Sequence, residues 1–191
     1  MTSVTEEELG YALEALRADR CVRSLRTMAE CDLAGEEGLL AQYRALNDIV
    51  LAWGTSNRVN HIELLVNRRL VTTYTCDGLI MSTPNGSTGH SLAAGGPIVH
   101  PETPAFLVSV ICPHALSHRP LVLPDNQEIE ARVRDEESEL MLSVDGQRTV
   151  PFRAEMSLKV RKSPQPVEFL NLPNYDYFRV LRQKLHWRGS S

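Results

Sequence analysis

The 191-residue sequence lacks the features that mark several special classes of protein. It has no run of about 18 apolar residues, so we expect no membrane-spanning helix and no membrane partner. Its first residues, MTSVTEEELG, lack the basic flank and apolar core of a signal peptide, which favours a cytoplasmic protein. It also lacks an excess of positive charge. The formal net charge of −4 argues against a broad nucleic-acid-binding surface, so we expect no nucleic-acid partner.

The cysteines and histidines show no metal-binding pattern. The cysteines are Cys21, Cys31, Cys76 and Cys112. They form no CxxC pair and no cysteine–histidine spacing typical of zinc, so we expect reduced thiols. His100, His114 and His118 flank two apolar runs, but their spacing also matches no familiar zinc motif. Structural or surface roles are favoured for these histidines, and we expect no metal site in this chain.

Composition and periodicity favour a soluble, mainly β (α+β) domain, with 42% hydrophobic and 23% charged residues. We expect a single domain over 1–191, made of a helix in 1–20, a β-rich body over 21–163 and a C-terminal segment with a helix over 164–191. Helical spacing predicts helices over 5–18 and 175–187. Apolar and alternating segments predict strands at 26–33, 45–52, 61–66, 70–75, 78–81, 106–112, 128–133, 139–144, 149–152 and 156–160. Three prolines make 164–173 an irregular stretch.

One polar stretch, CDGLIMSTPNGSTGHSLAAGGPIVHP at 76–101, follows an apolar segment. Residues 87–94 begin with Ser and Thr and end at two glycines, which predicts a short helix. Free N–H groups at its start, with the hydroxyls of Ser87 and Thr88, suit an anion or the polar edge of a nucleotide. The stretch is neither a P-loop nor a GxGxxG fingerprint. A purely structural turn and helix cap explains the pattern equally well.

Acidic and amide residues beside apolar segments also allow both a structural and a ligand-binding interpretation. Asp77 begins an apolar strand, where it could accept hydrogen bonds from ribose hydroxyls or could be an ordinary turn residue. Asn47 and Asp48 interrupt the apolar phrase ALNDIVLAW, where polar groups are costly unless they are satisfied. They either face a ligand or form a satisfied β-bulge.

Several phrases together resemble one family, the C-terminal domain of NAD kinases. These phrases are ALNDIV at 45–50, DGLIMSTPNGSTGHSLAAGGPIVHP at 77–101, ICPHALSHRPLVLP at 111–124, SVDGQ at 143–147 and YFRVLRQKLHW at 177–187. The family phosphorylates the adenosine-ribose 2′-hydroxyl of NAD to make NADP. The resemblance covers nearly the whole chain. It implies a β-sandwich-like domain with an N-terminal helix, a short helix after the Gly-rich loop and a C-terminal helix.

The resemblance also implies a set of NAD-binding residues. By this likeness, Asn47 and Asp48 hold the adenosine portion and its ribose, and Asp77 contacts the nicotinamide-side ribose or carboxamide. The loop over 88–91 cradles the adenine end. The complete implied set is Asn47, Asp48, Arg58, Thr75, Asp77, Asn85, Thr88, Gly89, His90, Ser91, Leu92, Ala93 and Gln147.

The sequence departs from the family's pattern at four of these positions. Asp48 replaces a glutamate, which keeps the charge and shortens its reach. Asn85 stands where Thr or Ser is usual, and Gly89-His90 replaces Ala-Tyr. An imidazole can stack and hydrogen-bond with less area than a phenol, so we expect a different affinity or selectivity for the base.

The sequence contains no Gly-Gly-Asp-Gly loop, which the family carries in an N-terminal α/β domain. That loop's aspartate is the proposed base on the 2′-hydroxyl, so we expect no catalytic residue in this chain. Its opening phrase resembles the one that follows the family's first domain. Phosphoryl transfer needs nucleophile, donor and cation together, so the chain alone should bind and not react. The alternatives are a non-catalytic NAD(P)-binding module, a truncated paralogue and, more weakly, a lipid-kinase relative.

The resemblance implies ligands and partners as well. NAD and NADP are the expected ligands, with ATP or polyphosphate as phosphate donor and Mg²⁺ bound together with the donor. The expected assembly is a homodimer or homotetramer, and a separate N-terminal kinase half is a further partner. Arg58 and Gln147 fall where relatives contribute contacts partly across a subunit interface.

Overall fold

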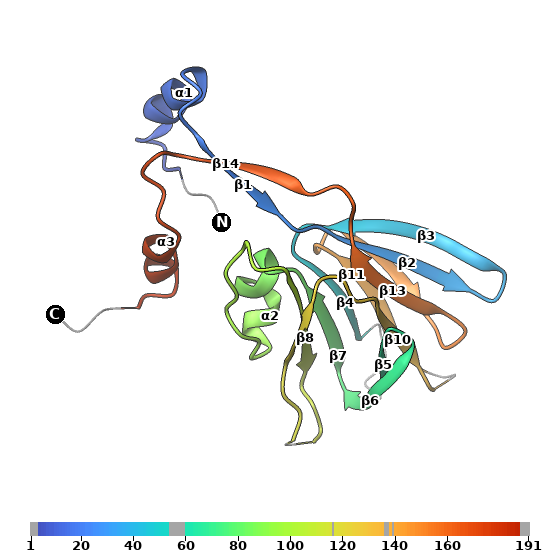
Figure 1. The fold of residues 1–191 in the computed structure, drawn as a ribbon. Helices are drawn as coiled ribbons and strands as arrows, with labels where there is room; N and C mark the ends of the chain where they lie inside the picture. The colour runs from blue at the N-terminus through green and yellow to red at the C-terminus, as the bar shows by residue number, and fades with distance from the viewer. Residues whose placement is uncertain (1–3, 54–59, 116, 136–137, 139, 188–191) are drawn as a thin grey trace. The chain divides into compact units, whose positions relative to one another are not determined.

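The computed structural model describes residues 4–53, 60–115, 117–135, 138 and 140–187. It divides into two compact units, Arg26–Val167 and the pair of segments Met1–Leu25 and Glu168–Ser191. Figure 1 labels the helices and strands along the chain. Each unit is described separately below.

The larger unit contains two six-stranded sheets in which every neighbouring pair of strands is antiparallel. The first sheet has the order β3 (Gly38–Ala45), β2 (Ala29–Gly35), β13 (Ser157–Lys162), β10 (Ile129–Val133), β5 (Asn60–Val66) and β6 (Arg69–Cys76). The second has the order β12 (Arg148–Phe152), β11 (Leu140–Val144), β4 (Asp48–Trp53), β7 (Gly78–Ser82), β8 (Ala105–Ile111) and β9 (Leu121–Pro124). The expected mainly β, sandwich-like fold is therefore confirmed.

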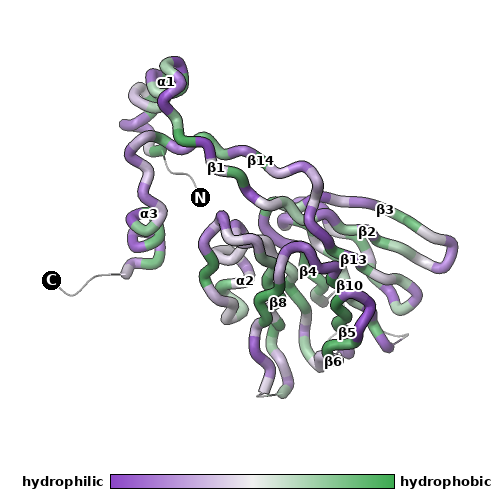
Figure 2. The backbone as a smooth tube through the Cα atoms, in the orientation of Figure 1, coloured by the Kyte–Doolittle hydropathy of each residue, from purple (hydrophilic) through white to green (hydrophobic). Residues whose placement is uncertain are grey.

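A single core lies between the two sheets. Alternate residues of β2, such as Cys31, point into it and meet side chains from the second sheet, such as Leu51 and Phe106. Strands β7 and β8 differ from this alternation, because β7 is buried at every position and β8 at all but its last. Most of β8 is correspondingly hydrophobic, with Ser109 as the exception (Figure 2). A strand that reads as one apolar run is covered on both faces, and a polar loop packs on the outer face of this pair.

The smaller unit is built from the two ends of the chain. Strand β1 (Val22–Arg26) pairs with β14 (Val167–Asn171), and Arg23 forms an ion pair with Glu168 at 3.1 Å. Helix α1 spans Leu9–Arg17, and α3 spans Tyr177–Lys184. Asp176 caps α3, because its carboxylate accepts the backbone N–H groups of residues 178 and 179. Within the described residues, no helix is long and apolar enough to cross a membrane.

The structure corrects several predicted boundaries. The strand predicted over 26–33 is two strands, since β1 ends at Arg26 and β2 begins at Ala29. The irregular stretch predicted over 164–173 contains β14, which was missed because its prolines lie just outside the strand. Strands β3 and β9 were missed as well. Helix α1 starts later than predicted because Thr5 and Glu8 form a turn before it, in which Thr5 N–H donates to Glu8 Oε2 at 3.0 Å.

All four cysteines are free, as expected for reduced thiols. Cys31 and Cys76 lie in the core, where burial raises the pKa of each thiol to about 12. A thiol that stays protonated near neutral pH is a poor nucleophile and a poor metal ligand. These two cysteines therefore act as packing residues.

Phe106 tests whether the unit depends on this shared core, since its ring is fully buried on β8. We expect Phe106→Ala to lower the free energy of unfolding by about 3–5 kcal/mol, because it leaves a cavity between the sheets. Val122 on β9 is 52% exposed, so the control Val122→Ala should change stability by less than about 0.5 kcal/mol. Urea denaturation measures both, and equal losses in the two variants would contradict the shared core.

Candidate functional site

The polar loop after β7 is a compact structure with little regular helix. The chain leaves β7 at Ser82 and forms a 3₁₀ turn, η1 (Asn85–Thr88), then helix α2 (His90–Ala93). Gly89 separates them with φ −106° and ψ −126°, which is outside the helical region. The short helix predicted over 87–94 is therefore present, but it begins only at His90, after the 3₁₀ turn. Gly95 reverses the chain with φ +80°, a conformation that favours glycine.

Buried hydroxyls hold this loop together from within. Ser87 Oγ donates to Val99 O and accepts Val99 N–H, both at 3.2 Å. Ser91 Oγ lies 2.9 Å from Ser109 Oγ on β8. A Cβ on Gly96 would come within 2.4 Å of Ser91 Oγ, so only glycine fits beside this pair. Of the two interpretations of the Ser87 hydroxyl, the structure therefore supports the structural one, and the Ser91 hydroxyl also has an internal partner.

The loop is also joined to the point where the chain passes from β3 to β4, at Leu46 and Asn47. Asn47 O accepts Thr83 N–H at 2.9 Å, and Asn47 Oδ1 accepts Asn85 Nδ2 at 2.8 Å. A Cβ on Gly86 would lie 2.2 Å from Asn47 O. The strand predicted over 45–52 is therefore wrong at its start. Asn47 belongs to a crossing between the sheets and is not part of a β-bulge.

Asp145 fixes this crossing from the other side. Its carboxylate accepts the N–H of Leu46 and of Asn47, both at 2.8 Å, and of Asp48 at 3.0 Å. Asp145 has φ +50°, in the turn between β11 and β12 that its Asp-Gly sequence predicts. The clamp was missed, because an Asp-Gly pair signals a turn and carries no information about partners 97 to 99 residues away.

Asp48 is an acidic side chain at the edge of this arrangement, only 8% exposed. Burial, and secondarily the negative charge of Asp145, raise the pKa of Asp48, while the nearby His90 opposes the rise. The imidazole of His90 is exposed at the start of α2, next to exposed Gly89. The structure thus brings Asn47, Asp48, Asn85 and His90 together.

The remaining predicted residues of the loop form its outer surface. Thr88 and Leu92 are half-buried, and Ala93 is exposed. With Gly89 and His90, they offer a surface of small, apolar and imidazole groups beside the Asp48 carboxylate. Such a surface can contact a planar base on one side and sugar hydroxyls on the other.

Asp77 and Thr75 lie apart from this cluster. Strands β4 and β7 pair with Asp48 opposite Ser82 and Ala52 opposite Gly78, so Asp77 is at the opposite end of the pair. Five residues of strand correspond to roughly 17 Å. Asp77 Oδ1 lies 3.6 Å from His114 Nε2, and Thr75 O accepts His114 N–H at 2.9 Å. Within one chain, the structure does not bring these two predicted residues to Asn47 and Asp48.

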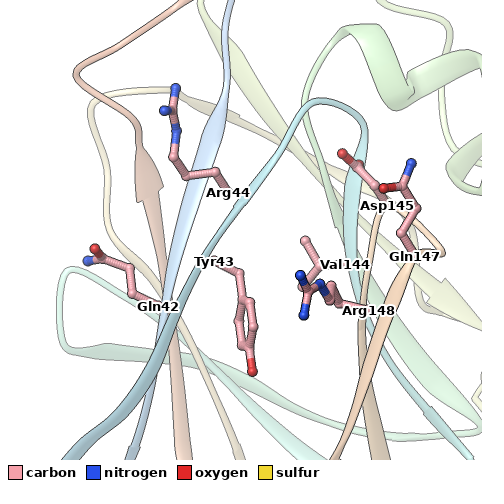
Figure 3. A pocket seen from close by; sticks show the side chains of 7 residues that line it. All are labelled: Gln42, Tyr43, Arg44, Val144, Asp145, Gln147 and Arg148. Atoms are coloured by element: carbon pink, nitrogen blue, oxygen red, sulfur yellow. The ribbon is translucent and has the colours of Figure 1, made fainter.

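Gln147 lies apart from both the Asn47–Asp48 crossing and Asp77. It lines a cavity of about 580 Å³ beside β3 and the β11–β12 hairpin (Figure 3). The lining residues are Gln42, Tyr43, Arg44, Val144, Asp145, Gln147 and Arg148. Of these, Gln147 belongs to the predicted NAD-binding set, whereas Tyr43 and Arg148 carry no motif signal in the sequence. Predicted Arg58 lies outside the described residues.

The histidines considered for a metal site have other neighbours. His118 packs edge-on against Tyr74 with ring centroids 4.9 Å apart, and His114 faces Asp77. In the part of the chain that the structure describes, no group of three or more His, Cys, Asp or Glu residues could hold a metal ion.

The fold and this loop define a β-sandwich domain with a polar surface, the candidate site, at one end of the β4–β7 pair. The family model for the ATP-NAD kinase C-terminal domain matches residues 46–172, which include both the crossing and the loop. The chain belongs to this family, as its sequence phrases predicted.

Individual relatives agree with this assignment. The chain is 39% identical to an NAD kinase of Gemmatimonas aurantiaca, over 100% of this chain and 66% of the relative. It is 38% identical to an NAD kinase of Geobacter metallireducens, over 98% of this chain and 66% of the relative. The chain thus spans slightly less than two thirds of the length of these relatives.

Two solved structures share the fold. Yeast NADH kinase complexed with NADH superimposes with a TM-score of 0.86 and 29% identity, over 97% of this chain and 55% of that one. An NAD kinase from Archaeoglobus fulgidus in complex with ATP gives a TM-score of 0.81 and 26% identity, over 99% of this chain and 70% of that one.

The Asp145 clamp can be tested by removing its carboxylate. Asp145→Gly keeps the positive φ accessible but leaves the N–H groups of residues 46–48 without their acceptor. We expect a loss of about 3 kcal/mol in the free energy of unfolding, since a hydrogen bond to a charged group contributes roughly 1.5–3 kcal/mol. Asp145→Asn tolerates the same φ and retains one oxygen, so it should recover about half of the loss. Denaturant titration of both variants measures this, and similar stabilities for the two would argue against the clamp.

Proposed function

We propose that this chain is the dinucleotide-binding part of an NAD kinase, which phosphorylates the adenosine-ribose 2′-hydroxyl of NAD with ATP or polyphosphate as donor. The observation that carries the proposal is the Asn47–Asp48 crossing, which is joined to the loop over 83–93 in a member of the ATP-NAD kinase C-terminal family. NADH in the complex of the yeast relative and ATP in that of the Archaeoglobus relative support these ligands.

The proposed contacts follow from the chemistry of each side chain. Asn47 Oδ1 accepts a hydrogen bond from Asn85 Nδ2, so the Nδ2 group of Asn47 is the donor that we assign to the ligand. The Asp48 carboxylate accepts hydrogen bonds from the ribose hydroxyls, and the His90 imidazole stacks on the base. Asn85 and Ser91 act by positioning, because their polar groups bind Asn47 and Ser109.

Asp77 and Thr75 take part from a second copy of the chain in this proposal. Asp77 lies at the far end of the β4–β7 pair, too distant to share one small ligand contact with Asp48, and Thr75 precedes it near the end of β6. A homodimer or homotetramer would bring one copy's Asp77 to another copy's crossing. Arg58 and Gln147 belong to the same proposed contact set.

The phosphate donor and its Mg²⁺ are assigned to a separate N-terminal kinase half. Mg²⁺ prefers carboxylate and phosphate oxygens, and no suitable cluster of acidic side chains occurs among the residues that the structure describes. The described residues therefore do not fit a magnesium site. Their proposed work is to bind the acceptor dinucleotide and orient its ribose.

An activity assay and a binding assay on the isolated chain test separately whether it binds NAD and whether it phosphorylates NAD. With NAD, ATP and Mg²⁺, we expect the purified 191-residue polypeptide to make no NADP above background, because its sequence contains no Gly-Gly-Asp-Gly loop. Calorimetry should still detect NAD binding. The Gemmatimonas aurantiaca relative, assayed in parallel, is the positive control. Appreciable NADP formation would overturn the inactivity, and absence of NAD binding would overturn the proposed function itself.

Asp48 should give NAD binding a characteristic pH dependence. Its raised pKa means that protonation, and loss of the ribose hydrogen bonds, begins at a higher pH than for an ordinary carboxyl. We expect Asp48→Asn to weaken NAD binding about tenfold at pH 7 and to remove this pH dependence. Calorimetric titrations from pH 4 to 8 measure both effects.

The same substitution should stabilise the fold. A carboxyl whose folded-state pKa is raised favours folding in its protonated form, and this contribution is lost as pH rises through the folded pKa. Asp48→Asn should therefore raise Tm at pH 7, and the difference should vanish below the pKa of the unfolded state. A lower Tm at pH 7 would contradict the assigned role.

A further inference from the structure

One buried hydroxyl lies between the crossing and the loop after β7. Thr83 directly follows β7, is fully buried and does not belong to the predicted NAD-binding set. Its Oγ1 donates to Leu46 O at 2.5 Å and accepts Gly86 N–H at 3.3 Å, with a longer contact of 3.4 Å to Asn47 O. The donor and the acceptor of a single hydroxyl are therefore used on two different segments of the chain.

At the crossing, Thr83 and Asp145 bind the two backbone groups of the same residue. The Asp145 carboxylate accepts Leu46 N–H at 2.8 Å, and the Thr83 hydroxyl donates to the carbonyl oxygen of Leu46. Thr83 N–H also donates to Asn47 O at 2.9 Å. Thr83 thus contacts both residues that precede Asp48, and β4 begins from a segment that two separate turns hold.

In the loop, Thr83 binds the 3₁₀ turn η1 that precedes α2. Gly86, whose N–H it accepts, packs so closely on the crossing that a Cβ there would lie 2.2 Å from Asn47 O. The two backbones therefore meet without a side chain between them. The Thr83 hydroxyl bonds to both sides of this contact, which determines how far the Asp48 carboxyl lies from the loop that carries His90.

We propose that Thr83 is a positioning residue of the dinucleotide site, whose hydroxyl holds Asp48 and the base-contacting loop at the spacing that one nucleoside requires. Thr83 itself does not touch the ligand, since its side chain is fully buried. The inference rests on the proposed function and adds the residue that joins the ribose-binding and base-binding parts of the site. Two contacts to one ligand depend on their relative placement, so loss of this internal hydroxyl weakens binding of the whole nucleoside.

The experiment separates positioning from a general effect on stability. Thr83→Val keeps the shape of the side chain but leaves Leu46 O and Gly86 N–H without their partner, whereas Thr83→Ser keeps the hydroxyl. The matched control is Val160→Ala, because Val160 is fully buried on β13 in the other sheet and its loss leaves a cavity away from the site. Calorimetry with NAD and thermal denaturation are performed on the wild-type chain and all three variants.

We expect Thr83→Val to weaken NAD binding about tenfold and Thr83→Ser to remain within about threefold of the wild type. Val160→Ala should lower Tm but leave NAD binding within about twofold. The exchange rate of the Gly86 amide, measured by NMR on the ligand-free chain, should rise in Thr83→Val and return in Thr83→Ser. Circular dichroism checks folding, and Thr83→Ala replaces Thr83→Val in the comparison if the valine variant does not fold.

A double-mutant cycle tests whether Thr83 acts through Asp48. If the hydroxyl positions the Asp48 carboxyl, Thr83→Val should cost less affinity in the Asp48→Asn background, so the double variant should lose well under the product of the two single losses. Independent, multiplicative losses would overturn the positioning role. So would wild-type affinity in Thr83→Val, an unchanged Gly86 amide, or an equal loss of affinity in Val160→Ala. Absence of NAD binding to the wild type would instead remove the proposed function, and this inference with it.

Discussion

The carboxylate of Asp145 accepts three consecutive backbone N–H groups where the chain passes from one sheet to the other. These groups belong to a crossing, in which Leu46 and Asn47 lie outside both strands. A buried N–H without an acceptor is costly, so the crossing needs a partner of this kind. Because Asn47 in turn holds Thr83 and Asn85, the loop that bears His90 is placed through the same clamp. The β11–β12 turn, which contains Asp145, therefore fixes the positions of the residues in the proposed site.

The second constraint is the burial of β7 and β8 on both faces. The loop after β7 has to cover the outer face, and the hydroxyls of Ser87 and Ser91 satisfy its interior. Its exposed residues are consequently the few that do not serve packing, including Gly89 and His90. Asp48 differs from these satisfied hydroxyls, because burial and the negative charge of Asp145 both disfavour its ionised form. A carboxyl group kept where its charge is disfavoured favours a functional role over a stabilising one.

The antiparallel pairing of β4 with β7 also separates groups that are adjacent in the motif. Asp77 and the loop residues lie only a few positions apart in sequence, but β7 runs between them and places them at opposite ends. In our proposal, a second copy of the chain is needed to reunite them around one dinucleotide. The cavity beside the β11–β12 hairpin is lined by Asp145 and not by Asp77.

The sequence by itself determined the mainly β fold, the β11–β12 turn from its Asp-Gly pair, and membership of the family through the block at 77–101. Such features depend on local pattern, which period and turn chemistry report directly. Only the tertiary structure decided that Ser87 and Ser91 point inward, that β14 forms between prolines, and that Asp145 holds a crossing almost one hundred residues earlier. Each of these depends on a partner distant in sequence, and a hydroxyl or carboxylate carries the same local signal whether its partner is a ligand or the protein's own backbone.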